Sequence, residues 1–215
     1  MAKKMPTPRR TPKDLRPEVR KRLEATALEI FSTTDFHRAN LREIAKRAGV
    51  SFASIYKYYG SKEGLLFGTI DTILKALADR LIDHLKGIED LKEKIRKAFW
   101  VELDFYERHP EVGRILFLIL PFRKWMEDET FKQEKFVDAY MAVLQQGQKD
   151  KILNPNVWPG VFLDIIHGIV MMRFMMWIYR GQKERLTANF SELFEMLWRA
   201  ISNPDLLKDQ IPQDS

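Results

Sequence analysis

Apolar side chains recur every three to four positions along most of the chain, and no segment alternates apolar and polar residues as a half-buried strand would. The longest such row consists of Leu66, Ile70, Ile73, Leu74, Leu77, Leu81 and Leu85. Short stretches that contain Pro, Gly or Asn separate the rows from one another. This pattern predicts an all-α fold of about nine helices.

Four helices are expected in the first part of the chain, beginning near Pro17, Asn40, Ser51 and Ser61. Five more are expected from Leu91 to before Pro110, from Val112 to Leu120, from Phe122 or Lys124 to Gln148, from Trp158 to Arg180, and from a Thr187 cap onward. We expect the last dozen residues to fray.

Two short helical patterns follow one another between Asn40 and Tyr59. Asn40 can cap the first, and Gly49 stands where a positive φ would end that helix and begin a tight turn. Ser51 then caps the second, which buries Ile55 and Tyr59. Two short helices joined by a turn of three or four residues that contains glycine are typical of a helix-turn-helix.

The charge is distributed unevenly around this motif. The chain has a net charge of +6, but residues 1–62 hold fifteen Lys and Arg against six Asp and Glu, and the remainder holds an excess of three acidic residues. This asymmetry predicts a head that binds a polyanion on a neutral or acidic body, although charge alone would fit a merely solvated basic surface. Residues 1–16 are rich in Pro, Lys and Arg and are expected to form a flexible arm, which either reaches DNA or has no role.

The runs IAKRAGVS and SIYKYYGSKEGL, at residues 44–51 and 54–65, closely resemble the TetR family of transcriptional regulators. The resemblance covers about residues 17–66. It departs from the family pattern at the turn near Asp35, at Asn40 in place of a capping Thr, and at Tyr59 in place of a late Phe. It implies a helix-turn-helix domain over residues 17–62, an effector-binding and dimerisation domain over 63–205, and a tail over 206–215.

Matching positions in that family imply which side chains of the head contact DNA. Five would face base edges, namely Ser51, Phe52, Ala53, Ser54 and Lys57, and Tyr56, Tyr58 and Lys62 would hold phosphates. The chemistry of the residues agrees, because Ala or Phe can meet a thymine methyl group and Lys57 can contact a guanine. Arg42 and Lys62 stand at helix N-termini, which favour phosphate. Tyr58 has packing as an alternative role.

A homodimer is expected from the helix at about Trp158–Arg180, which is apolar around nearly its whole circumference. One face can pack in its own body, and the other, with the stripe at about Thr187–Ser202, would form a four-helix interface with a second copy. The alternative is a monomer in which this helix is simply central. Asp164, His167 and Arg173 interrupt the segment, so it is a poor membrane span.

The body also offers aromatic and sulfur surface suited to a bulky apolar effector. The candidate lining residues are Trp100, Tyr106, Phe117, Trp125, Phe136, Tyr140, Phe162, His167, Met171, Arg173 and Phe174. Any one of them can equally be plain core. Arg173 either binds an acidic group of the ligand or pairs with a carboxylate such as Glu195 across the dimer, and His167 lines either a pocket or the interior.

These patterns favour a dimeric repressor in the cytoplasm that a hydrophobic small molecule releases from a palindromic operator. The alternative is a DNA-binding protein that a protein partner regulates, with no small-molecule pocket. An enzyme is disfavoured, because four scattered histidines, no cysteine and no phosphate-binding glycine loop provide no catalytic constellation. No cofactor and no metal are expected. Neither the operator nor the sign of regulation follows from the sequence.

Overall fold

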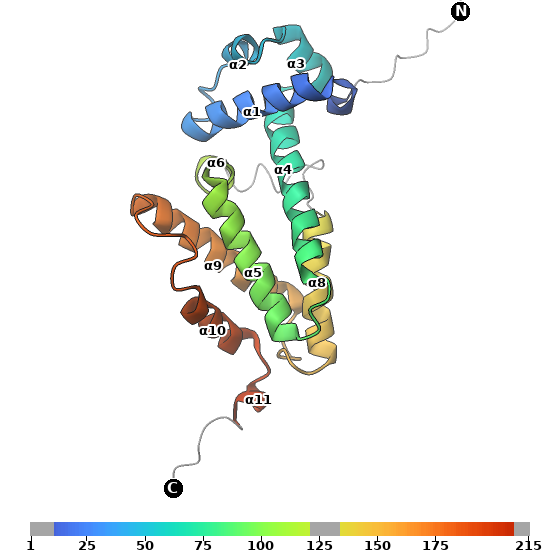
Figure 1. Ribbon diagram of the computed structural model, residues 1–215, viewed down its shortest axis with the longest axis vertical. Coiled ribbons are helices and arrows are strands. Elements are labelled where there is room, and N and C mark those ends of the chain that lie inside the picture. The colour runs from blue at the N-terminus through green and yellow to red at the C-terminus, as the bar shows by residue number, and fades with distance from the viewer. Residues whose placement is uncertain (1–10, 121–133, 209–215) are drawn as a thin grey trace, which may run out of the picture. The chain divides into compact units, whose positions relative to one another are not determined.

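The computed structural model of the protein describes residues 11–120 and 134–208, and within these ranges it contains helices and no strand (Figure 1). One isolated bridge joins Leu153 to Ser202. The all-α prediction is therefore confirmed. The chain divides into two compact units: unit 1 is Met1–Ile73 with Arg114–Lys132, and unit 2 is Leu74–Gly113 with Gln133–Ser215.

Unit 1 contains three complete α-helices and the beginning of a fourth, long one. A 3-10 turn, η1 (Pro12–Asp14), precedes α1 (Pro17–Thr33), α2 (Leu41–Ala48), α3 (Phe52–Tyr59) and the first part of α4 (Lys62–Leu85). The π-helical turn η2 (Ile115–Ile119) also belongs to it. Its core is formed by buried residues of every helix, including Leu23, Phe31, Ile44, Ile55, Leu65 and Ile70. Figure 1 shows α2 and α3 on one side of α1.

The predicted caps fix the boundaries of these helices. The side-chain oxygen of Asn40 accepts a hydrogen bond from Arg42 N at 2.9 Å. Ser51 Oγ accepts one from Ser54 N at 3.1 Å, and Gly49 ends α2 with φ +63°. A Cβ atom is strained at this φ, so the turn between α2 and α3 requires glycine. The helix-turn-helix geometry is thus dictated locally by the sequence.

Unit 2 holds the second part of α4 and the helices of the body. These are α5 (Leu91–Arg108), α6 (Pro110–Arg114), which ends at the unit boundary, α8 (Glu134–Lys149), α9 (Pro159–Tyr179), α10 (Phe190–Ile201) and α11 (Pro204–Lys208). α9 contacts α5, α8 and α10, and Figure 1 shows these helices gathered together. Their shared core includes Phe99, Leu103, Leu144, Ile166, Phe174 and Phe194.

Three expected boundaries differ from the observed ones. Thr187 does not cap α10, because its amide and its hydroxyl both donate to Glu107 Oε2 at 3.0 Å, and the helix begins at Phe190 after Asn189. The helix expected over Val112–Leu120 is split between α6 and η2.

Further along, the short helix α11 replaces the first part of the expected frayed tail. Both expected starts of the seventh helix, Phe122 and Lys124, lie outside the described residues.

Candidate nucleic-acid interface and interior site

The helix α3 presents most of its side chains to solvent and is held to unit 1 by two of them. Ile55 is fully buried, and the buried ring of Tyr59 places its hydroxyl 3.0 Å from Glu24 Oε1, to which it donates. Burial raises the pKa of the Glu24 carboxyl, and the bond from Tyr59 partly offsets this rise. The other side chains of α3 are not part of the core and are available to contact a ligand.

The predicted DNA-contacting residues lie together on this part of unit 1. Six are exposed, namely Arg42, Ser51, Phe52, Ala53, Tyr56 and Lys57, and Ser54, Tyr58 and Lys62 are half-buried. Ser51 and Ser54 are partly occupied with each other, since their hydroxyl oxygens lie 2.8 Å apart.

Two aromatic rings stand exposed at the start of α3. Phe52 is 39% exposed and Tyr56 is 47% exposed, and their ring centroids are 5.0 Å apart in an edge-on arrangement. The guanidinium carbon of Arg42, on α2, lies 5.6 Å from the centroid of the Phe52 ring. We call Arg42, Phe52 and Tyr56 the reading patch. Its apolar rings could contact thymine methyl groups in a DNA groove, and the guanidinium at its edge could contact a phosphate.

The two lysines of this region differ in their surroundings. Lys57 is exposed, and its ammonium lies 5.5 Å from the centroid of the Tyr58 ring. Lys62 donates to the carbonyl of His37 at 3.2 Å and lies 4.8 Å from the centroid of the Phe36 ring. Lys62 therefore ties the start of α4 to the loop that precedes α2, whereas Lys57 lies on the exposed side of α3.

Sequence reasoning missed the residues of α1 that fix the reading helix. Arg22 Nε donates to the carbonyl of Ala48 at 2.6 Å and so ties the end of α2 to α1, while Glu24 receives Tyr59. Glu29 receives two hydrogen bonds from Arg47, at 2.8 and 2.7 Å. These partners lie 18 to 35 residues apart, beyond the reach of any periodicity argument.

Unit 2 encloses a carboxyl group that sequence reasoning also missed. Glu102, on α5, is 3% exposed, and its Oε2 accepts a hydrogen bond from the hydroxyl of Tyr140 at 2.9 Å. Its Oε1 lies 3.6 Å from His167 Nε2, a buried atom that makes no hydrogen bond. Burial raises the pKa of the Glu102 carboxyl, and His167 and Tyr140 partly offset the rise. A signal for Glu102 existed, because it stands four residues after Ala98 and four before Tyr106, on the apolar stripe of its helix.

Five of the residues predicted to bind an effector form two groups of ring contacts in unit 2, the first of Phe136, Tyr140 and His167 and the second of Tyr106 and Phe174. Ring centroids join Phe136 to His167 at 5.6 Å, Tyr140 to His167 at 5.4 Å, and Tyr106 to Phe174 at 5.9 Å. Phe162 is also buried in this unit.

The other candidates lie elsewhere. Phe117 belongs to unit 1, Trp125 lies outside the described residues, Trp100 is half-buried, and Met171 is exposed on α9. Arg173 donates to two backbone carbonyls of its own chain, those of Leu186 at 3.4 Å and Ala188 at 2.7 Å.

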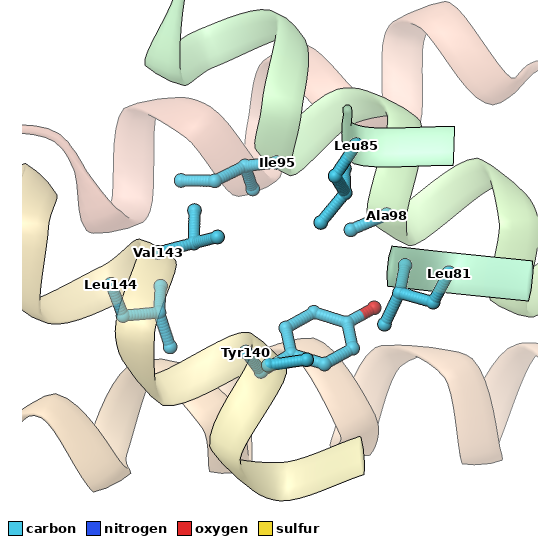
Figure 2. A pocket seen from close by; sticks show the side chains of 8 residues that line it. Leu81, Leu85, Ile95, Ala98, Tyr140, Val143 and Leu144 are labelled. Atoms are coloured by element: carbon cyan, nitrogen blue, oxygen red, sulfur yellow. The ribbon is translucent and has the colours of Figure 1, made fainter. Parts of the chain in front are cut away.

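A small apolar cavity lies beside Tyr140, between α4, α5 and α8. Its lining residues are Leu81, Leu85, Ile95, Ala98, Ala139, Tyr140, Val143 and Leu144. Figure 2 shows that the ring of Tyr140 closes one side of it. The cavity volume is about 10 Å³, which is room for roughly one water molecule. A drug-sized ligand needs several hundred cubic ångströms, so this cavity must open before it can hold one.

Among residues 11–120 and 134–208, one face of α9 is covered and the opposite face is not. Its buried residues are Gly160, Phe162, Ile166, Val170 and Phe174. The opposite face carries exposed apolar side chains, among them Met172 at 53% and Tyr179 at 83%, and Met196 of α10 is exposed as well. α9 is also the one helix of the described ranges that is long and apolar enough to cross a membrane, by length and composition alone. One face of this helix thus packs within its own body, as expected.

The chain matches the family of bacterial regulatory proteins described as the tetR family over residues 23–69, which are α1 from Leu23, the helix-turn-helix and the start of α4. Nucleoid occlusion factor SlmA of Vibrio campbellii is 36% identical over 94 residues, 44% of this chain and 48% of that protein. The chain thus matches about half the length of this relative. The fatty acid metabolism regulator protein of Bacillus subtilis is 23% identical over 195 residues, 89% of this chain and 99% of that protein.

A solved structure extends the likeness to the body. The transcriptional regulator FadR from Bacillus subtilis, in complex with stearoyl-CoA, superimposes with a TM-score of 0.72 and 18% sequence identity over 82% of this chain and 96% of that one. At this identity the likeness shows a common fold, which includes the helices of unit 2.

Proposed function

Because the chain belongs to the TetR family of bacterial regulatory proteins, we propose that it is a dimeric, sequence-specific DNA-binding regulator in the cytoplasm. We propose further that it is a repressor that a hydrophobic small molecule releases from a palindromic operator. The observation that carries the proposal is the capped and anchored helix α3, whose exposed face bears the reading patch and Lys57 on the basic part of the chain.

We expect the predicted DNA-contacting side chains of the head to fall into two groups. Ser51, Phe52, Ala53, Ser54 and Lys57 would read base edges, while Arg42, Tyr56, Tyr58 and Lys62 would hold phosphates. Lys57 extends from the solvent-facing side of α3 and would contact a guanine. Lys57→Ala is then expected to weaken operator binding by about 1–3 kcal/mol and to relax specificity at one base pair of each half-site.

Selection of bound sequences from a random oligonucleotide pool tests the DNA-binding function directly. The proposal expects an enriched palindrome with half-sites about 34–36 Å apart, because each head of a dimer reads one half-site. Enrichment of no inverted repeat would refute the proposed dimeric DNA binding. Lys149→Ala, on α8 of unit 2, is a matched control that removes one exposed lysine outside the head and leaves the selected sequence unchanged.

The second copy would cover the exposed face of α9 together with α10. Val161, Ile165, Gly168, Met172 and Tyr179 follow one another at helical spacing along this face. A Cβ atom built at Gly168 meets no atom within 4 Å, so the face is open at its middle and a partner helix can approach closely there. A large uncovered apolar face of this kind is typical of a homodimer interface.

Met172→Glu tests this interface by placing a charge in its centre. The side chain is more than half exposed, so the protomer is expected to fold normally while the dimer dissociates in sedimentation velocity. Leu118→Glu, at an exposed apolar residue of unit 1, is the matched control and is expected to remain dimeric. A Met172→Glu protein that stays dimeric would place the interface elsewhere.

An effector would act by opening the cavity of unit 2. The FadR structure that resembles this chain contains stearoyl-CoA, and we propose a ligand of similar character, with a long apolar chain. Such a ligand must separate α4, α5 and α8, because the present cavity holds about one water. α4 is continuous from Lys62 in unit 1 to Leu85 at the cavity, so its displacement would be transmitted to the head.

The closed cavity also favours a second candidate, a DNA-binding protein that a protein partner controls. A panel of acyl compounds distinguishes the two candidates when operator release is followed by fluorescence anisotropy. To convert a population that mostly binds the operator into one that mostly does not, the ligand must bind the second state about 10⁴-fold more tightly than the first. Operator release by an acyl compound supports the first candidate, and a panel without effect favours the second.

A further inference from the structure

The strongest unassigned feature of the molecule is the polar cluster of Glu102, Tyr140 and His167 in unit 2. One oxygen of the buried Glu102 carboxyl is satisfied by the hydroxyl of Tyr140. The other oxygen faces His167 Nε2 at 3.6 Å, too far for a good hydrogen bond, and that nitrogen is buried without a partner. Buried polar atoms are rarely left without a hydrogen bond, so this nitrogen requires an explanation.

The cluster lies at the end of the apolar cavity. The ring of Tyr140 forms one wall of the cavity (Figure 2), and the hydroxyl of the same side chain donates a hydrogen bond to Glu102. The other named walls, such as Leu81 and Val143, are apolar. A ligand chain that opens the cavity would therefore bring its polar end to the cluster when it runs past Tyr140.

The charges around Glu102 determine which polar end can be accommodated. Two residues along α5, the carboxylate of Asp104 is paired with Arg80 at 2.8 Å and Arg108 at 3.1 Å, and residues two apart on a helix do not share a face. Glu102 faces Tyr140 and His167, and His167 is the one group of the pair that can carry a positive charge. Among the residues that the structure describes, His167 is the one cation paired with Glu102, so a ligand carboxylate here would add a second negative charge beside a buried acid.

We propose that Glu102, Tyr140 and His167 form the polar end of the effector site and select a ligand whose buried head is an uncharged hydrogen-bonding group over one that ends in a free carboxylate. A thioester, ester or hydroxyl fits, because its oxygen can accept from His167 Nε2 when that nitrogen carries a proton. This inference rests on the proposed small-molecule control, and Glu102 acts in it as a specificity-determining residue.

The test uses one ten-carbon chain with three heads: the N-acetylcysteamine thioester of decanoic acid, decan-1-ol and decanoate. Binding to the full-length protein is measured by calorimetry at pH 7.5, and operator release by anisotropy. The uncharged ligands are expected to bind at least about tenfold more tightly than decanoate. In Glu102→Gln the preference should shrink to about threefold or less, because decanoate gains affinity when the charge is removed.

Glu195→Gln is the matched control. Glu195 is a carboxylate of the same unit that pairs with Lys92 at 2.9 Å, away from the cavity lining, so its removal should leave the preference unchanged. Circular dichroism and thermal unfolding establish that both variants are folded.

Equal binding of decanoate and the thioester by the wild-type protein would overturn the inference, as would a preference that survives in Glu102→Gln. Failure of all three ligands to bind would overturn it together with small-molecule control, although DNA binding would stand. Head-dependent binding without operator release would support the site and refute its role in repression.

Discussion

Phe52→Ala is the sharpest test of how the head reads DNA. Phe52 is the first residue of α3, and its ring forms the reading patch with Tyr56 and Arg42. The side chain is not among the buried core residues, and alanine is the better helix former, so the variant should fold about as stably as the wild type. Any loss of operator affinity then reports on the contact with DNA.

The exposed area of the ring sets the magnitude. At 39% exposure, a phenylalanine of roughly 200 Å² keeps about 80 Å² in contact with water. If the operator covers all of it, burial is worth about 2 kcal/mol at 25 cal/mol per Å², or about 30-fold in affinity for each half-site. A dimer on a palindrome loses this twice. This estimate of about 2 kcal/mol is an upper bound, because ordering side chains on binding costs free energy.

Anisotropy titrations against the selected operator at several salt concentrations measure the loss and identify its origin. Phe52→Ala should lower affinity at every salt concentration without changing the slope of log K against log salt, since no phosphate contact is removed. Arg42→Ala is the contrasting variant and should reduce the slope by about one for each head.

A contact with thymine can be tested on the DNA side of the same interface. Deoxyuridine lacks only the methyl group of thymine, so replacing the contacted thymine should weaken the wild type and leave Phe52→Ala unaffected. An unchanged affinity of Phe52→Ala for the full operator would refute the reasoning. A loss that depends on salt would show that the ring acts only by ordering Arg42.

Three further predictions concern stability, measured by urea unfolding. Gly49→Ala should cost about 1–2 kcal/mol, because φ is +63° and a Cβ atom is strained in that conformation. Gly113→Ala should cost about 1–3 kcal/mol, because its Cβ would lie 2.5 Å from the buried ring of Phe174; a neutral result would mean that the ring moves freely. Glu102→Gln should stabilise the protein at neutral pH by an amount that disappears below the ordinary carboxyl pKa of 4.5, and a constant difference across pH would contradict the raised pKa.

The sign of the last prediction follows from linkage. Burial raises the pKa of Glu102 in the folded protein, so the folded state holds this proton more tightly than the unfolded state. The stability that comes from this group is fully present below pH 4.5 and is lost as the pH rises through the raised value. Glutamine has no proton to lose, and the variant therefore gains on the wild type as the pH rises.

Local signals made the head predictable and distant partners did not. Asn40, Gly49 and Ser51 act on backbone atoms within a few residues of themselves, and each has the role expected from its type. Arg22 and Glu24 bond residues 26 and 35 positions away, a pairing that exists only once α1 has packed on α2 and α3. Their roles could not be read from spacing.

The body shows a different limit. Aromatic composition placed Phe136, Tyr140 and His167, whose rings contact one another, in the same list as Met171, which is exposed on α9. Periodicity classifies positions as inward or outward and says nothing about which inward polar group lacks a partner. That property depends on three helices meeting at Glu102, and it emerges only from their packing.

The closed cavity has a consequence for regulation that composition could not reveal. A ligand that must separate α4, α5 and α8 loses the free energy of that opening from its affinity, and the same opening is what distinguishes the liganded state from the free one. A preformed pocket would bind more tightly but would leave α4 where it was. If a small molecule controls this protein, the small size of the cavity is therefore the reason that binding can move α4. If none does, the cavity stays closed, and control must come from a protein partner that binds the surface of the dimer.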